Sequence, residues 1–347
     1  IMKTITKLFL VILSASSLIL STANAGELAV SGGATATYKT GGADMSTGKG
    51  IGVSNELDFT ASGELDNGFT WKWQTQLDDA GTVNDDTTLE VGTPYGKVGF
   101  YISENDISSK LKYGIGAMGP GSDYGSPTTV QWGPTMNAYN NIGISTPSGL
   151  LPFGGSVDFA YAPNLSSTQG ASAKASGTSE TKAAGDDMMQ VRIMASPIDG
   201  LSVGGDYATH SQASGATRYM ASSGGVFAKY TTGPVSIGGA RTEYEPTQLF
   251  STGTTTNYDT NMYGIQFAVN DALSVSYSEE KSTLSSRATS STNVVTTTDT
   301  SMKVKHMQAA YVVGGATIGL AIADADDSDY TLGKDEKTTI LSVAMAF

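Results

Sequence analysis

The sequence predicts an all-β fold, a transmembrane antiparallel β-barrel of about 16 strands with long extracellular loops and short periplasmic turns. Three observations predict it. The last eleven residues alternate in polarity, the same alternation recurs along the chain, and short connections alternate with long polar ones. A period of two residues is typical of a strand with one apolar face.

The C-terminal segment 337–347 shows the alternation most clearly. One face carries Thr339, Leu341, Val343, Met345 and Phe347, and the other carries Thr338, Ser342, Ala344 and Ala346, with Ile340 as the exception. A half-apolar strand that ends the chain on an aromatic residue is typical of an outer-membrane barrel. The segment is therefore predicted to be the last strand.

Three early segments show which face of the expected strands is apolar and which is polar. Apolar and small residues alternate with polar ones over 28–39, 56–65 and 69–78, and the last two segments are joined by Asp66-Asn67-Gly68. An Asn-Gly pair is a strong hairpin signal. We expect the apolar face to contact lipid and the polar face to line a lumen.

Thirteen further segments bring the expected number of strands to sixteen. They lie near 87–93, 97–103, 140–146, 155–163, 188–196, 201–210, 223–231, 235–244, 258–269, 273–281, 300–312, 316–323 and 337–347. Two of them fit poorly, because 235–244 places Arg241 and Glu243 in phase with Val235, and 300–312 changes phase midway. A bulge or a boundary error is expected in each.

The connections between these strands alternate in length. Short turns are expected at 66–68, 94–96, 197–200, 232–234, 270–272 and 313–315, and longer polar loops at 40–53, 79–86, 104–139, 164–187, 211–222, 245–257, 282–299 and 324–336. A soluble β-sandwich gives no reason for every second connection to be short. Residues 26–347 are therefore interpreted as one barrel domain.

The N-terminal segment 1–25 has the features of a cleaved signal peptide. Lys3 and Lys7 precede a short apolar run, and Ala23-Asn24-Ala25 provides a small-x-small cleavage site. The apolar run is too short to span a bilayer comfortably as an uncleaved anchor. We expect cleavage after Ala25.

Composition excludes several classes of function. The chain has 42 glycines and no cysteine, so disulfides and thiolate metal sites are excluded. It has 20 basic and 33 acidic residues, a net charge of −13. Because nucleic-acid binding needs a basic surface, no nucleic-acid partner is expected. The charge fits an exported soluble protein or a cation-attracting pore.

Several segments resemble the Gram-negative general porins, the trimeric, sixteen-stranded diffusion channels. Residues 92–98 (GTPYGKV) resemble the turn into the fifth porin strand, 140–147 (NNIGISTP) the sixth strand, 159–163 (FAYAP) the end of the seventh, and Phe347 the terminal assembly signal. The resemblance covers the whole chain after residue 25. It implies an outer-membrane channel for passive diffusion of ions and small hydrophilic solutes.

The resemblance also implies an assembly and a constriction. It implies a homotrimer, with Gly32-Gly33-Ala34 and residues 344–347 as flat contact surfaces, and it implies that loop 104–139 folds into the lumen. The chain departs from the family before the sixth strand, where Met136-Asn137-Ala138-Tyr139 replaces the usual arginine, and it lacks the Pro-Glu-Phe-Gly-Gly signature. We also expect the amino group of Gly26 to pair with the carboxylate of Phe347 where the barrel closes.

Charged residues of the lumen are the candidate pore constriction. The loop offers Glu104, Asp106 and Asp123 opposite Lys110 and Lys112, and the wall offers Glu56, Asp58 and Glu64 with Lys72 and Arg192 as basic counterparts. Opposed charges across a narrow lumen would orient polar solutes. Each residue fits ordinary solvation of the lumen equally well. Because acids predominate, a mild cation preference is expected.

Nothing in the sequence points to catalysis, a cofactor or a metal site. His210 and His306, the two histidines, lie in no nucleophile motif. The acidic run Asp324, Asp326, Asp327 and Asp329 lacks the spacing of an EF-hand and is interpreted as a solvated loop. An ion there would bridge loops or lipopolysaccharide, which with outer-membrane lipid is an expected partner. The alternatives are a substrate-specific channel, a barrel enzyme and an exported soluble β adhesin.

Aromatic residues in the expected strands are interpreted as girdles at the two lipid interfaces. They are Tyr38, Phe69, Trp71, Trp73, Phe100, Tyr161, Tyr230, Tyr263 and Phe267. A ladder of aromatic residues inside the lumen would instead indicate a sugar-specific channel. Their phase favours the girdle.

Overall fold

The computed structural model describes most of the chain after residue 25. It describes residues 26–43, 49–78, 83–102, 105, 107, 115–119, 126–128, 130–133, 136, 139–163, 187–214, 217–248, 254–289 and 295–347. The expected signal peptide, 1–25, lies outside the described residues.

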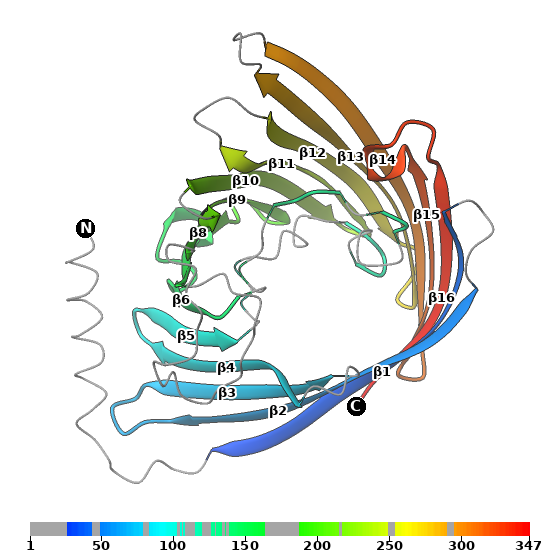
Figure 1. Cartoon of the computed structure of the whole chain (residues 1–347). Coiled ribbons are helices and arrows are strands. Elements are labelled where there is room, and N and C mark those ends of the chain that lie inside the picture. The colour runs from blue at the N-terminus through cyan, green and yellow to red at the C-terminus, as the bar shows by residue number, and fades with distance from the viewer. Residues whose placement is uncertain are drawn as a thin grey trace.

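Sixteen strands in the described part of the chain form a closed antiparallel barrel in which each strand pairs with its neighbours in the sequence (Figure 1). They are β1 (Glu27–Ala43), β2 (Gly50–Glu64), β3 (Thr70–Asp78), β4 (Val83–Thr93), β5 (Gly96–Ile102), β6 (Asn141–Ser145), β7 (Ser156–Ala162), β8 (Asp187–Ala195), β9 (Leu201–Ser214), β10 (Thr217–Thr232), β11 (Val235–Gln248), β12 (Thr254–Ala268), β13 (Leu273–Thr289), β14 (Val295–Val313), β15 (Ala316–Asp326) and β16 (Glu336–Ala346). The predicted fold class and strand number are confirmed.

The first and last strands close the barrel. Gly33 is opposite Ala346, and beyond this pair Gly32 N donates to Phe347 O and Phe347 N donates to Gly32 O, both at 2.9 Å. The expected pairing of Gly26 with Phe347 is wrong. β1 extends past the end of β16 and continues along β2, where Glu27 is opposite Ser62.

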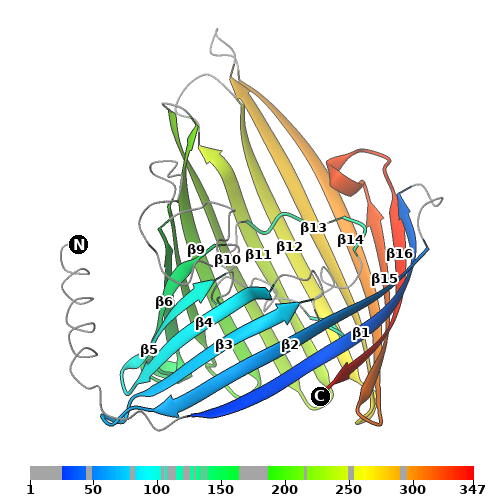
Figure 2. The same ribbon diagram turned by 60° about the horizontal axis from the view of Figure 1, so that its bottom comes forward.

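The two ends of the barrel differ. At the turn end the connections are short, as between β2 and β3, where Gly68 adopts φ 79° and its N–H donates to Leu65 O at 2.8 Å. The other end, here called the loop end, carries the connection between β5 and β6. Figure 2 shows that the wall of β10–β14 rises higher at the loop end than that of β3–β5. Among the described residues, no helix has the length and apolar character needed to cross a membrane.

The strands extend farther toward the loop end than the alternation indicated. The expected loop 211–222 is mostly strand, because β9 reaches Ser214 and β10 begins at Thr217. Likewise β13 and β14 leave only residues 290–294 between them. Serine and threonine occupy both faces of these extensions, so no alternation marks them. Beyond an apolar band neither face needs to be apolar, and the ladder continues on backbone hydrogen bonds alone.

Of the two irregularities expected in β11 and β14, the boundary error is confirmed, because β11 reaches Gln248 and β14 begins at Val295. A register shift in β11 opposite β10 lies beyond the expected segment, between Glu245 and Gln248. β11 pairs with β12 without a break from Val235 to Tyr244, and β14 pairs with β13 and β15 in continuous register. Arg241, Lys303 and Lys305 therefore lie in phase with the apolar residues of the outward face. The charged residues interrupt the apolar pattern, not the backbone.

The faces follow the predicted rule over most of the wall. Large apolar side chains such as Leu28, Val30, Ile193 and Ile265 are exposed on the outward face. The girdle aromatics Tyr38, Phe100, Tyr230, Tyr263 and Phe267 are also exposed there. The inward face carries polar residues, small apolar ones and some large apolar ones, such as Met188, Phe227 and Met302.

Candidate functional site

The inner wall of β2–β5 carries charged side chains joined by hydrogen bonds. On β2, Asp58 accepts from Gln74 Nε2 at 3.0 Å and from Gln76 Nε2 at 3.2 Å. On β4, Glu90 accepts from Lys97 Nζ at 2.5 Å and from the Tyr101 hydroxyl at 2.9 Å. This part of the wall is polar and hydrogen-bonded from strand to strand.

A hollow of about 520 Å³ lies along this wall near the turn end. Lys72, Glu64, Glu90 and Lys97 line it. Lys72 is opposite Glu90 in the pairing of β3 with β4, and its side chain is exposed. Two lysines thus face two glutamates in one inward hollow.

Arg192 lies in a second inward cluster, on β7–β9. Its Nε and Nη2 atoms are each 3.2 Å from Asp158 Oδ2, and the two side chains are 8% and 13% exposed. Asp206, opposite Arg192 on β9, accepts from Gln190 Nε2 at 2.9 Å. The alternation in the sequence had placed Arg192 on the lumen wall, but the two aspartates around it were not singled out.

The predicted wall residues do not gather at one point. Glu56 and Asp58 lie together on β2, Lys72 lies on the neighbouring β3, and Arg192 lies five strands farther on. The predicted loop residues Glu104, Asp106, Lys110, Lys112 and Asp123 lie outside the described residues.

Described residues of the connection between β5 and β6 lie against the inner wall of the opposite side of the barrel (Figure 1). Ala117 N donates to Ser276 Oγ on β13 at 2.7 Å, and Met118 N donates to Gln308 Oε1 on β14 at 3.0 Å. Gln131 O accepts from Thr260 Oγ1 on β12 at 3.0 Å. The wall thus supplies partners for backbone groups of Ala117, Met118 and Gln131.

Glycines of the wall leave room for this segment. A Cβ atom at Gly264 would lie 3.2 Å from Ile115 Cβ, and one at Gly238 would lie 2.9 Å from Ile115 Cδ1. A Cβ atom at Gly319 would meet Met118 Cε at 2.4 Å. A larger residue at these positions would push the segment away from the wall.

Apolar contacts fix the rest of the described segment. Ile107 and Met136 pack against Ala160, Met188 and Ala208 on β7–β9. Farther round the wall, Trp132 packs against Phe227, Ala240 and Met262, and Val130 packs against Met302 and Val304. These clusters explain why apolar residues occupy part of the inward face.

A short helix at the loop end contacts the same segment. Asp329 of η6 (Ser328–Tyr330) accepts from Thr128 Oγ1 at 2.9 Å, and Lys334 Nζ is 2.5 Å from its Oδ2. The hydrogen bonds from Lys334 and then from Thr128 lower the pKa of Asp329. The hydrogen bond to Asp329 raises the pKa of Lys334.

The two histidines lie on different strands, and acids of the acidic run form ion pairs. His306 Nε2 is 3.8 Å from Glu280 Oε1, both deeply buried, and His210 lies on β9. Asp324 and Asp326 pair with Lys337 and Lys305. Among the described residues, no three His, Cys, Asp or Glu side chains are grouped as metal ligands would be.

Three tyrosines on the inner wall were not singled out by the sequence reasoning. Tyr244 on β11 and Tyr258 on β12 are direct cross-strand partners, with stacked rings whose centroids are 5.9 Å apart. Tyr330 of η6 lies 5.5 Å from Tyr258. Phase alone would have found the strand pair, because both residues alternate with outward ones, Glu243 and Asp259.

The outward face of β11–β16 carries a belt of charges. Arg241 is 2.8 Å from Glu243 Oε1 and 2.6 Å from Asp259 Oδ2, and Lys303 is 2.9 Å from Glu279 Oε1. Arg241 follows Val235 by six residues, about 20 Å along the strand and about 15 Å along the barrel axis. The apolar band below it is thus shorter than the usual ~25 Å.

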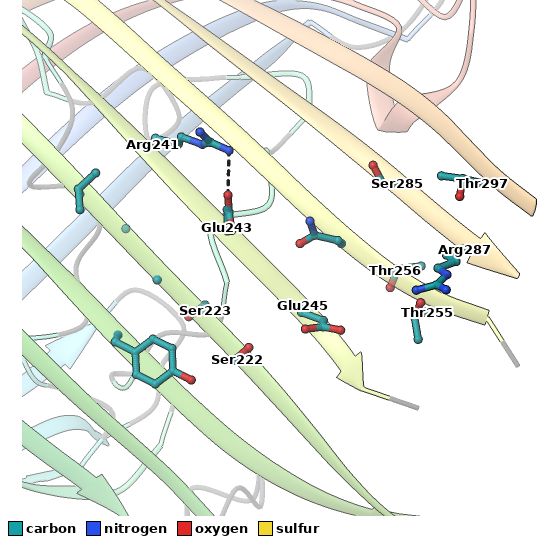
Figure 3. Close-up of a pocket in the computed structure, with 15 residues that line it drawn as sticks. Ser222, Ser223, Arg241, Glu243, Glu245, Thr255, Thr256, Ser285, Arg287 and Thr297 are labelled. Atoms are coloured by element: carbon teal, nitrogen blue, oxygen red, sulfur yellow. Dashed lines mark hydrogen bonds and ion pairs between the residues drawn. The ribbon is translucent and has the colours of Figure 1, made fainter. Parts of the chain in front are cut away.

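A polar hollow of about 710 Å³ adjoins this belt (Figure 3). Ser222, Gly224 and Val226 of β10 border it, and across it lie Arg241, Glu243, Glu245 and Arg287. Arg241, Val226 and Glu243 belong to the outward face. This hollow is therefore on the outside of the barrel, separate from the inner wall.

Comparisons with solved structures give the fold. OmpT, an outer-membrane protein of Vibrio cholerae in a trimer form, is 14% identical over 93% of this chain and 100% of its own, with a TM-score of 0.68. An anion-selective porin from Comamonas acidovorans is 14% identical over 93% and 100%, with a TM-score of 0.67. Salmonella typhi OmpF, in complex with daunomycin, is 14% identical over 93% and 98%, with a TM-score of 0.62.

The chain has the fold of the outer-membrane porins. The resemblance drawn from the sequence motifs is thus confirmed at the level of the fold. No family model and no curated protein sequence matches the chain. In this porin fold the inner wall of β2–β5 and the described segment opposite it are the candidate site.

Proposed function

We propose that the protein is an outer-membrane porin, a water-filled channel for passive diffusion of ions and small hydrophilic solutes. The supporting observation is the exposure of charged side chains on the inward face of a closed barrel. Lys72 and Glu56 point inward and are exposed. Because a charged side chain is very costly to place in a dry interior, exposed inward charges require water in the lumen.

The proposed constriction lies between β2–β5 and the segment 104–139. Residues 115–118 and 130–132 of the segment are held against β10–β14, which leaves the charged wall of β2–β5 opposite them. Lys72 and Lys97 face Glu56, Asp58 and Glu90 there. The wall carries both signs, and the acidic excess of the chain supports a mild cation preference.

We further propose that the chain is exported, inserts into the outer membrane of a Gram-negative bacterium and forms homotrimers. The exposed apolar outward face supports the membrane over a soluble adhesin. The trimer form of the similar Vibrio cholerae protein supports self-association. Gly32, Ala34 and Ala36 give β1 a flat outward surface suited to it.

Lipopolysaccharide is the proposed lipid partner of the outer hollow and the charge belt. The belt begins about 15 Å above the turn end of β11, about 10 Å below the upper edge of a ~25 Å apolar band. Arginine and lysine side chains extend from this depth toward the headgroups. Arg241, Lys281 and Lys303 offer cations for phosphates, and Glu243 and Asp259 offer oxygen ligands for bridging divalent ions.

Planar-bilayer recording of the purified protein tests the channel. We expect stepwise increments of conductance and a reversal potential in a salt gradient that indicates cation preference. Neutral solutes above one cutoff size should be excluded. Replacing Lys110 and Lys112 by glutamate should raise the cation preference if segment 104–139 lines the pore. A protein that is soluble without detergent and gives no conductance would contradict the proposal.

A further inference from the structure

We propose that Tyr244, Tyr258 and Tyr330 form a saccharide-binding platform on the inner wall, on the loop-end side of the segment 130–133. The proposal rests on the channel function and adds a class of solute to it. A solute entering from the loop end would meet these rings before the point where residues 130–133 cross the wall.

The three rings form a continuous row across two strands and η6. Tyr244 and Tyr258 are stacked at an interplanar angle of 16°, and Tyr330 is tilted by 54° against Tyr258. All three side chains are half-buried. Each of the three therefore keeps part of its surface exposed at the lumen wall.

A hydrogen bond between the wall and residues 130–133 shows where the three tyrosines lie relative to that segment. Thr260, two residues from Tyr258 on the same face of β12, donates to Gln131 O at 3.0 Å. Tyr258 is the next inward residue toward the loop end. The tyrosines thus lie directly above the point where the segment crosses the wall.

Hydrogen bonds distinguish Tyr330 from the other two tyrosines. Tyr330 Oη is 2.7 Å from Ser282 Oγ, which is itself 2.7 Å from Thr260 Oγ1. This contact holds η6 to the wall, although Tyr330 has the left-handed φ of 58° that is uncommon for a bulky residue. Among the described residues, the hydroxyls of Tyr244 and Tyr258 have no hydrogen-bond partner, so they remain available to water or to a solute.

The chemistry of the row fits a sugar ring. A pyranose has C–H groups on its faces and hydroxyls around its rim, and a tyrosine offers an apolar ring face with a polar tip. Thr256 lies beside Tyr258 on the inward face, and the carboxylate of Asp329 is 62% exposed beside Tyr330. Such contacts are individually weak, as passage requires, because a solute that binds tightly would not leave the pore.

Single-channel recording with a linear glucose oligosaccharide, maltohexaose, tests the platform. Polyethylene glycol of the same hydrodynamic size is the reference, because it has no ring faces. We expect maltohexaose added at the loop end to interrupt the current for resolvable times and the glycol not to. Tyr258→Ala should shorten these interruptions about tenfold, because it removes the apolar ring on which the sugar would stack.

Matched variants separate stacking from a structural effect. Tyr258→Phe keeps the ring and should keep the interruptions, and Tyr263→Ala, which removes an outward tyrosine of the same strand, should leave them unchanged. If Tyr258→Ala alters the open-channel conductance, Tyr244→Ala provides the test, because Tyr244 has no ring contact with η6 in the described structure.

Equal interruptions by maltohexaose and the glycol would overturn the platform. So would residence times that Tyr258→Ala and Tyr244→Ala leave unchanged. Absence of any conductance would instead contradict the channel function itself, so the two failures are distinguishable.

Discussion

Removing the guanidinium of Arg192 is expected to destabilise the barrel strongly. Arg192 holds Asp158 through two contacts of 3.2 Å and lies opposite Asp206, and all three side chains are largely buried. Arg192→Leu would leave Asp158 without its cation. Removal of one partner of a buried ion pair costs about 3–5 kcal/mol, which corresponds to a change of about a hundredfold to a few thousandfold in the unfolding equilibrium.

The outer wall offers a matched control with the same residue type. Arg241 also pairs with two carboxylates, but its side chain is 55% exposed. Exposed pairs contribute about 0–1 kcal/mol. Arg241→Leu should therefore change the free energy of unfolding by less than about 1 kcal/mol.

Urea unfolding of the protein in lipid vesicles, followed by tryptophan fluorescence, measures both variants. The double variant Arg192→Leu with Asp158→Leu should recover part of the loss, because it removes the unpaired carboxylate of Asp158. Equal losses in Arg192→Leu and Arg241→Leu would refute the argument from burial.

Three further predictions concern the channel. Lys72→Glu should shift the reversal potential in a potassium chloride gradient toward cations; an unchanged potential would place Lys72 outside the ion path. Ser276→Ala combined with Gln308→Ala removes two acceptors of the inner segment and should increase current fluctuations; steady currents would contradict their anchoring role. The lowered pKa of Asp329 means that its contact with Lys334 contributes stability above the unfolded pKa of about 4 and loses it as pH falls through the folded value. Wild-type currents should therefore be steady near neutral pH and fluctuate only in acid, whereas Asp329→Asn should fluctuate at both.

Alternating polarity predicted the strands wherever one face contacts lipid. The segments 28–39 and 337–347 were placed within a few residues, and 56–65 was placed except for the first six residues of β2, because an apolar outward face leaves a period of two in the sequence. The pattern vanished where both faces are polar. The loop-end parts of β9, β13 and β14 were therefore taken for loops.

Two side-chain clusters of the inner wall depend on the pairing between strands. Tyr244 and Tyr258 occupy inward positions that phase already indicated, but only the closed barrel brings them side by side with Tyr330. Asp158 and Asp206 are far apart in the sequence and meet at Arg192 only through the register of β7–β9. Register between strands is a property of pairing, which a single sequence does not display.

The sequence by itself determined an antiparallel barrel of sixteen strands, because each strand has to present an apolar face to lipid and that requirement is local. Only the tertiary structure decided which inward side chains meet, where the segment between β5 and β6 rests, and that Arg241 and Lys303 belong to a belt on the outside. These depend on strand stagger and on contacts between residues more than a hundred positions apart, such as Ala117 with Ser276. No local pattern encodes such contacts.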